Sequence, residues 1–116
     1  MSELTILHNP RCSKSRQTLQ LLQDKGLSPE IIEYLKTPID KEQIKNIVEL
    51  LGLSSAKDLM RKGEDAYKEQ QLALEEDETK LIQAMVDTPK LIERPIVLAN
   101  GKAAIGRPPE AVLAIL

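Results

Sequence analysis

Hydrophobic residues along this chain occur first as short continuous runs and then at helical spacing. The apolar run at residues 4–7 predicts a buried strand, and leucines at helical spacing over residues 13–25 predict a helix that Gly26 ends. A second apolar run, at residues 31–35, predicts another strand. A strand, a helix and a strand at this spacing predict a βαβ unit, whose parallel strands are joined by a right-handed crossover.

The middle of the chain has only helical periodicity. Asp40 and Gln43 have the spacing of a capping box, and apolar residues follow at helical spacing as far as Gly52. Shorter helices are expected within residues 54–60, 65–72 and 78–86. Together these segments predict an all-helical insert at about residues 40–87, packed on the sheet.

The last part of the chain returns to the strand pattern. An apolar run at residues 95–99 is followed by Asn100-Gly101, the strongest short hairpin signal, so residues 102–105 are expected to return antiparallel. Pro108-Pro109 then opens a final helix to Leu116. The order β-α-β, helical insert, β-β-α is the thioredoxin-like pattern, an α/β fold with a four-stranded mixed sheet and helices on both faces.

Composition and charge narrow the classes of function. The 116 residues predict one domain, residues 1–116, and with 41% hydrophobic but only 2% aromatic residues its core must be aliphatic. So few aromatic rings, with a net charge of −2, argue against binding to nucleic acid or to an anionic membrane. No apolar run approaches the roughly 20 residues that span a bilayer. A single cysteine and an N-terminus unlike a signal peptide predict a cytoplasmic protein.

That cysteine, Cys12, lies between the first strand and the first helix, in a cationic loop. Unpaired N–H groups and the macrodipole at a helix start favour an anion, and Arg11, Lys14 and Arg16 add positive charge. Such surroundings lower the pKa of a thiol. A reactive thiolate is therefore favoured over the alternative, a partly buried cysteine that acts as a small hydrophobe.

Residues around the cysteine limit its chemistry. Ser15 stands where a Cys-x-x-Cys motif has its second cysteine, which excludes dithiol exchange within this loop. His8 and Cys12 alone cannot fill a four-ligand zinc site. The residues favour two roles for His8 equally: a base that promotes the thiolate, or a buried histidine at the end of a strand.

Three arginines are candidates for binding an oxyanion. Arg94 and Arg107 each precede a proline and flank the predicted hairpin, while Arg61 stands at a predicted helix end. The planar guanidinium matches tetrahedral oxyanions and stays charged. The alternative for each is a surface salt bridge or a helix cap, and for Arg61 the two interpretations are equally favoured.

Four segments together resemble the glutaredoxin-coupled arsenate reductase family over nearly the whole chain. They are His8-Asn9-Pro10-x-Cys12-x-x-Ser15-Arg16, Leu59-Met60-Arg61-Lys62, Glu93-Arg94-Pro95-Ile96-Val97 and Gly106-Arg107-Pro108. The resemblance implies the thioredoxin-like fold with a helical insert, and a proline at Pro95 that is cis beside the active-site loop. It also implies that Cys12 is the nucleophile, that Arg61, Arg94 and Arg107 hold the oxyanion, and that His8 and Ser15 support the loop. Arg11, Ser13 and Lys14 differ from the resistance enzymes of the family, and this chain looks like the compact chromosomal branch.

The resemblance also implies a mechanism for arsenic detoxification. The Cys12 thiolate attacks arsenate, glutathione attacks the adduct as co-substrate, glutaredoxin removes the glutathione, and arsenite leaves. No metal or bound organic cofactor is required. Two alternatives are a general glutathione-dependent thiol oxidoreductase and an RNA-polymerase-binding transcription regulator of the same superfamily. Convergence of Arg61, Arg94 and Arg107 on Cys12 would favour arsenate.

Overall fold

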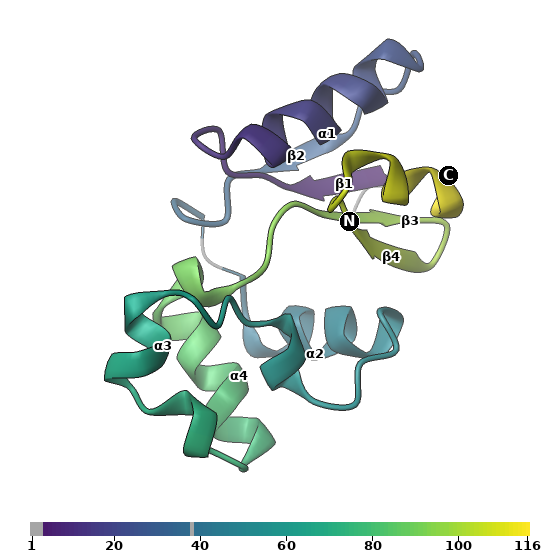
Figure 1. Cartoon of the computed structure of the whole chain (residues 1–116). Helices are drawn as coiled ribbons and strands as arrows, with labels where there is room; N and C mark the ends of the chain where they lie inside the picture. The colour runs from purple at the N-terminus through teal and green to yellow at the C-terminus, as the bar shows by residue number, and fades with distance from the viewer. Residues whose placement is uncertain (1–3, 38) are drawn as a thin grey trace. The chain divides into compact units, whose positions relative to one another are not determined.

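The computed structural model describes residues 4–37 and 39–116, which divide into two compact units (Figure 1). The sheet unit comprises residues 4–37 and 94–116, and the helical unit comprises residues 39–93. The sheet unit contains β1 (Leu4–Leu7), α1 (Ser13–Asp24), β2 (Glu30–Ile32), β3 (Ile96–Ala99), β4 (Lys102–Ile105) and the 3₁₀-helix η4 (Pro109–Ile115). The helical unit contains α2 (Lys41–Leu50), η1 (Ala56–Leu59), α3 (Asp65–Glu69), η2 (Leu72–Leu74), α4 (Glu78–Asp87) and η3 (Pro89–Leu91).

The sheet has four strands in the order β2-β1-β3-β4. β1 and β2 are parallel, with Leu7 opposite Ile32, whereas β1–β3 and β3–β4 are antiparallel. This arrangement confirms the predicted α/β class with a four-stranded mixed sheet. Aliphatic side chains of the sheet, α1 and η4 form its core, as the scarcity of aromatic residues predicts. The buried members are Ile6, Leu22, Val97, Ala99, Val112 and Ile115.

One edge of this sheet gathers segments that are far apart in the sequence. Because β2 and β4 run parallel to β1 and β3 runs against it, the ends of β1, β2 and β4 and the start of β3 all lie at the same edge. The segments that follow or precede these strand ends therefore become neighbours: residues 8–12, 33–36, 106–107 and 94–95. They include the cysteine loop and two of the three candidate arginines.

The hairpin between β3 and β4 confirms the Asn-Gly signal. Asn100 and Gly101 both have positive φ, 54° and 71°, as a type I′ turn requires. Gly26 ends α1 with φ of 78°, the left-handed conformation that glycine adopts without a steric penalty.

The helical unit has its own aliphatic core. The predicted capping box is present: Gln43 N donates to Asp40 Oδ1 over 2.8 Å, and Asp40 N donates to Gln43 Oε1 over 2.9 Å. α2 and α4 pack against each other. The fully buried side chains include Ile44, Leu59, Leu81, Met85 and Leu91. The unit contains the predicted insert of residues 40–87.

Four predicted elements differ from the structure, one of them the short helix expected within residues 54–60, which is the 3₁₀-helix η1. The second strand ends at Ile32, not at residue 35, because β1 ends at Leu7 and residues 33–37 turn away, with Thr37 N bonded to Glu33 O over 2.9 Å. The helix expected over residues 65–72 ends at Glu69, and Gln71 follows with φ of 54°, outside the helical region. The final helix is a 3₁₀-helix. None of the helices formed by the described residues has the length and apolar character that crossing a bilayer requires.

Candidate active site

Cys12 is the N-cap residue of α1, at the edge where the strand ends meet. Its backbone is extended (φ −94°, ψ 124°), its N–H donates to Asn9 O over 3.0 Å, and its carbonyl accepts the first helical bond from Arg16 N over 3.0 Å. The side chain is partly exposed. The thiol therefore stands at the helix start, where N–H groups lack intrahelical acceptors.

Arg107 brings its guanidinium to this thiol from the end of β4. Its Nη2 donates to Cys12 Sγ over 3.7 Å, and its Nε donates to the carbonyl oxygen of Arg94 over 2.8 Å. The carbonyl contact fixes the plane of the guanidinium group beside the sulfur. Two sequence segments 95 residues apart thus form one site.

Arg94 supplies a second guanidinium group from the start of β3. Its Nε is buried and has no hydrogen-bond partner among the described residues. A buried donor without an acceptor costs free energy, typically about 1–3 kcal/mol, and an incoming anion would remove that cost. Both peptide bonds that follow these arginines, Arg94–Pro95 and Arg107–Pro108, are cis.

The electrostatic environment lowers the pKa of the Cys12 thiol. Partial burial alone would raise this pKa, but the backbone N–H groups of Ser15 and Lys14 and the positive charges of Arg94 and Arg107 together outweigh it. A lowered thiol pKa increases the fraction of the nucleophilic thiolate near neutral pH. The charges that act on Cys12 are those of Arg94 and Arg107, not the neighbouring cations on which the sequence argument relied. One of those cations, Arg16, instead donates to Pro10 O over 2.9 Å.

His8 and Ser15 form a buried pair beneath the loop. His8 Nδ1 lies 2.6 Å from Ser15 Oγ, and Ser15 Oγ also accepts from Asn9 N over 3.0 Å. Burial is the largest influence on His8 and lowers its pKa; the charge of Arg16 lowers it further, while Glu33 raises it. In the neutral Nε2–H tautomer, Nδ1 accepts a hydrogen bond that the Ser15 hydroxyl donates. His8 and Ser15 therefore hold the conformation of the loop through buried hydrogen bonds.

Arg61, the third candidate arginine, belongs to the helical unit. Its backbone N–H donates to Leu91 O over 2.7 Å, and its Nη1 lies 2.9 Å from Glu64 Oε2. This is the salt bridge that the sequence allowed as the alternative to oxyanion binding. The structure thus brings Cys12, Arg94 and Arg107 together, and pairs Arg61 with a carboxylate.

Gly106 and Thr18 also shape the site, although the sequence indicated no role of its own for either residue. A Cβ on Gly106 would lie 2.5 Å from Thr18 Oγ1 and 2.8 Å from Pro95 Cγ. Gly106 N donates to Pro95 O over 2.9 Å, directly before Arg107. The glycine before Arg107 was a usable signal of close packing, whereas nothing around Thr18 in the sequence marks it.

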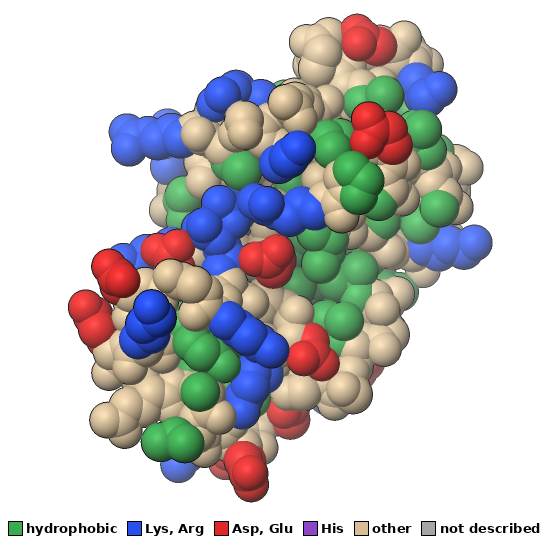
Figure 2. All heavy atoms as spheres, in the orientation of Figure 1, with side chains coloured by type: hydrophobic (Ala, Val, Ile, Leu, Met, Phe, Trp, Pro, Cys, Tyr) green, Lys and Arg blue, Asp and Glu red, His purple; other side chains and the backbone are tan. Residues whose placement is uncertain are grey.

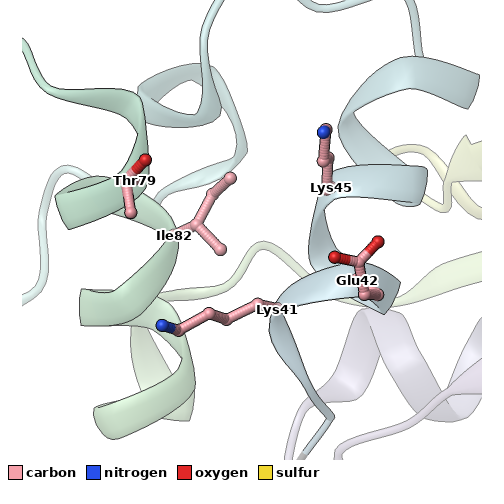
Figure 3. A pocket seen from close by; sticks show the side chains of 5 residues that line it. All are labelled: Lys41, Glu42, Lys45, Thr79 and Ile82. Carbon is pink, nitrogen blue, oxygen red and sulfur yellow. The ribbon is translucent and has the colours of Figure 1, made fainter.

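A hollow in the helical unit has no comparable chemistry. It lies between α2 and α4, has a volume of about 190 Å³, and is lined by Lys41, Glu42, Lys45, Thr79 and Ile82 (Figure 3). In this view Ile82 points toward α2 and Lys41 reaches toward α4. None of these side chains is an activated nucleophile. Blue and red side chains are interspersed over this unit in Figure 2, whereas blue ones gather over the start of α1.

Comparison with known proteins agrees with this geometry. The model of the ArsC family matches residues 7–115. The chain is 57% identical over 115 residues to the uncharacterized protein YfgD of Escherichia coli (strain K12), covering 98% of this chain and 97% of that protein. It is 51% identical over 119 residues to an arsenate reductase of Neisseria meningitidis serogroup B (strain ATCC BAA-335 / MC58), covering 100% of both.

A solved structure, the arsenate reductase from Vibrio cholerae, superimposes with a TM-score of 0.95 at 48% identity, covering 97% of each chain. This match confirms the predicted thioredoxin-like fold.

Proposed function

This chain belongs to the ArsC family, and from that premise we propose that it reduces arsenate to arsenite with Cys12 as the nucleophile. The observation that carries the proposal is the pairing of a thiol of lowered pKa with two guanidinium groups at one sheet edge. Arg107 Nη2 lies 3.7 Å from the sulfur, and the buried Nε donor of Arg94 has no partner within the described part of the chain. That arrangement suits a tetrahedral oxyanion held for attack by the thiolate.

In the first step, the Cys12 thiolate attacks arsenic(V) of the bound oxyanion. A sulfur–arsenic bond forms, an arsenic–oxygen bond breaks, and the oxygen leaves as water after protonation. Arg94 and Arg107 hold the oxygens and offset their charge, and we assign Arg61 to the same oxyanion. For Arg61 this requires exchange of its Glu64 contact for the substrate. His8 and Ser15 position the loop.

In the later steps, reductant comes from outside the chain, since Cys12 is its only cysteine. The glutathione thiol replaces a second arsenic-bound oxygen, which leaves as water. The glutaredoxin thiolate then attacks the glutathione sulfur and forms a mixed disulfide, while the electron pair of the broken bond reduces arsenic(V) to arsenic(III). Water cleaves the remaining Cys12–arsenic bond, which releases arsenite and restores the thiol. This series of steps requires no metal or bound organic cofactor, and we propose that the protein acts in the cytoplasm.

The site supports this proposal over the two alternatives. A general thiol oxidoreductase has no need of an unpaired guanidinium donor beside its cysteine. A Cys-x-x-Cys redox switch is excluded at the position of Ser15, whose hydroxyl is buried against His8.

Arsenate reduction by the purified protein, with glutathione and glutaredoxin, tests the proposal. Cys12→Ser removes the only sulfur able to bond arsenic in this loop, so we expect activity to fall to background. Folding should survive, because serine nearly matches cysteine in size and the site is polar, and circular dichroism checks this. If the wild type reduced no arsenate while Cys12 still reacted with glutathione disulfide, the general thiol-reductase interpretation would replace the proposal.

A further inference from the structure

A cavity in the sheet unit lies against the loop that carries Cys12. Its volume is about 220 Å³. One wall is the loop segment 8–11, and the other is formed by Glu33, Leu35 and Lys36 after β2. None of these residues takes part in the proposed oxyanion chemistry except His8, whose Nδ1 faces Ser15. The cavity is therefore a feature of the site that the mechanism leaves unused.

The cavity and the two arginines lie on different sides of the loop that carries Cys12. In the strand order β2-β1-β3-β4, the cysteine loop follows β1 and the cavity's second wall follows β2. Arg94 and Arg107 lie at the ends of β3 and β4, beyond β1 in the other direction. A group bound in the cavity would thus flank the loop without displacing an oxyanion held by the two arginines.

The loop wall of this cavity is held by hydrogen bonds between side chains and the backbone. Asn9 Oδ1 accepts from Arg11 N over 3.0 Å, and Asn9 N donates to buried Ser15 Oγ over 3.0 Å. Arg16 Nη1 donates to Pro10 O over 2.9 Å. A wall fixed in this way is formed before any ligand arrives, as is usual for small-molecule sites.

The side chains that line the cavity include charges of both signs. Arg11 and Lys36 provide two cationic groups and Glu33 provides one carboxylate. Lys36 Nζ lies 3.5 Å from Glu33 Oε1, but the Lys36 side chain is 79% exposed, so this ion pair is weak and open to exchange. Leu35, 44% exposed, adds an apolar surface between them.

We propose that this cavity binds glutathione as the incoming co-substrate, an inference that rests on the proposed function. Glutathione carries two carboxylates and one ammonium group, the reverse of the two cations and one carboxylate of the cavity. Its two ends would pair with Arg11, Lys36 and Glu33, and its central thiol would face the Cys12 loop. Arg94 and Arg107 would then hold the arsenic-bound oxygens on one side of the Cys12 loop, and the glutathione thiol would approach the arsenic atom from the other side.

Chemical-shift mapping by NMR locates the binding site directly. S-methylglutathione is the probe, because it keeps all three charged groups but cannot react with Cys12. We expect the largest amide shifts at residues 9–11 and 33–36. Shifts centred instead on Arg94, Pro95 and Arg107 would overturn the proposal.

A charge reversal tests the same site by kinetics. Cys12 thiolate attacks glutathione disulfide, forming a Cys12–glutathione disulfide and releasing one glutathione thiolate, and mass spectrometry follows the rate. Lys36→Glu should slow this exchange about fivefold, the scale of an exposed charge pair replaced by a repulsion. Lys102→Glu is the matched control: it makes the same change of net charge on an exposed residue at the opposite sheet edge, where β4 begins. That variant should change the rate by less than about twofold.

Alkylation by iodoacetamide distinguishes an effect on glutathione binding from an effect on the reactivity of the Cys12 thiol. This uncharged reagent has no glutathione group, so Lys36→Glu should leave its rate with Cys12 nearly unchanged. Equal slowing of alkylation and disulfide exchange, or an exchange rate equal to that of Lys102→Glu, would overturn the glutathione site. Neither result bears on arsenate binding, which the Cys12→Ser assay tests separately. A third outcome is that the wild type does not reduce arsenate, while Lys36→Glu slows disulfide exchange and Lys102→Glu does not. This outcome would support the glutathione site and refute the arsenate proposal.

Discussion

Arg107 in the sheet unit and Arg61 in the helical unit are the same kind of side chain held in two different ways. The Nε of Arg107 donates to a backbone carbonyl, that of Arg94, and its Nη2 reaches Cys12 Sγ. Arg61 is held by the carboxylate of Glu64, three residues along the chain. A carbonyl carries no net charge, so this contact orients the guanidinium group without itself neutralising the positive charge. A carboxylate neutralises that charge.

The two arrangements differ in how far each guanidinium group is already positioned for an anion. The charges of Arg94 and Arg107 already act on the site, because they lower the pKa of Cys12. The Nη1 of Arg61 lies 2.9 Å from Glu64 Oε2, and the proposed binding of substrate would have to replace this contact. Preorganised donors contribute most to transition-state stabilisation. We therefore expect the two arginines of the sheet unit to carry more of the catalysis than Arg61.

The largest effect is expected from Arg107→Lys. Lysine keeps the charge but loses the planar fork that contacts the Arg94 carbonyl and the sulfur together. We expect kcat/KM for arsenate to fall about 10²-fold, the scale of one oxyanion donor. Steady-state kinetics with circular dichroism as a folding control measure this. A variant within about twofold of the wild type would mean that the fork has no catalytic role.

The next effect concerns the packing that places Arg107. In Gly106→Ala, the new Cβ would meet Thr18 Oγ1 at 2.5 Å and Pro95 Cγ at 2.8 Å. We expect a loss of unfolding free energy of about 1–3 kcal/mol, typical of overpacking, with reduced arsenate turnover. Denaturant titration measures the stability.

Gly63→Ala in the helical unit is the matched control, because a Cβ there meets nothing within 4 Å. Its stability should change by no more than about 0.5 kcal/mol. Equal losses in the two variants would contradict the close packing at Gly106.

A smaller effect is expected on the free energy of unfolding as a function of pH, through the buried side chain of His8. Because burial lowers the pKa of His8, the unfolded chain binds the proton more readily than the folded one. Stability from this group is complete above the unfolded value, near pH 6.5, and is lost as pH falls through it toward the folded value. Urea titrations between about pH 5 and pH 8 should show this slope in the wild type, and His8→Gln should flatten it. A wild type more stable at the acidic end of that range, relative to the variant, would reverse the assignment.

The smallest effect is expected from Arg61→Lys. The lysine keeps a charge near Glu64 and replaces a side chain that already has a partner, so kcat/KM should fall only about threefold. The same assay as for Arg107→Lys measures it. A loss as large as that of Arg107→Lys would show that Arg61 contributes as much as the preorganised pair, and the comparison would fail.

Local patterns were enough to predict most elements of this fold. The Asn100-Gly101 turn, the capping box at Asp40 and the end of α1 at Gly26 all depend on residues a few positions apart, whose backbone preferences act within one turn. The position of Cys12 at a helix start follows from the same short-range pattern. The resemblance to the arsenate reductases indicated the thioredoxin-like fold, which the sheet order and the match to a solved structure confirm.

The cations that lie near the Cys12 thiol could be identified only from the tertiary structure. The neighbours Arg11, Lys14 and Arg16 were expected to supply the charge, whereas Arg94 and Arg107 are the cations that lower the pKa of Cys12. Likewise, the second strand stops at Ile32 because its partner β1 stops at Leu7. A local pattern was enough to place the cysteine at a helix start, since helix starts are encoded by residues a few positions apart. Only the pairing of β1, β3 and β4 determined its charged surroundings, because electrostatic interactions depend on distance in space and strand order sets that distance.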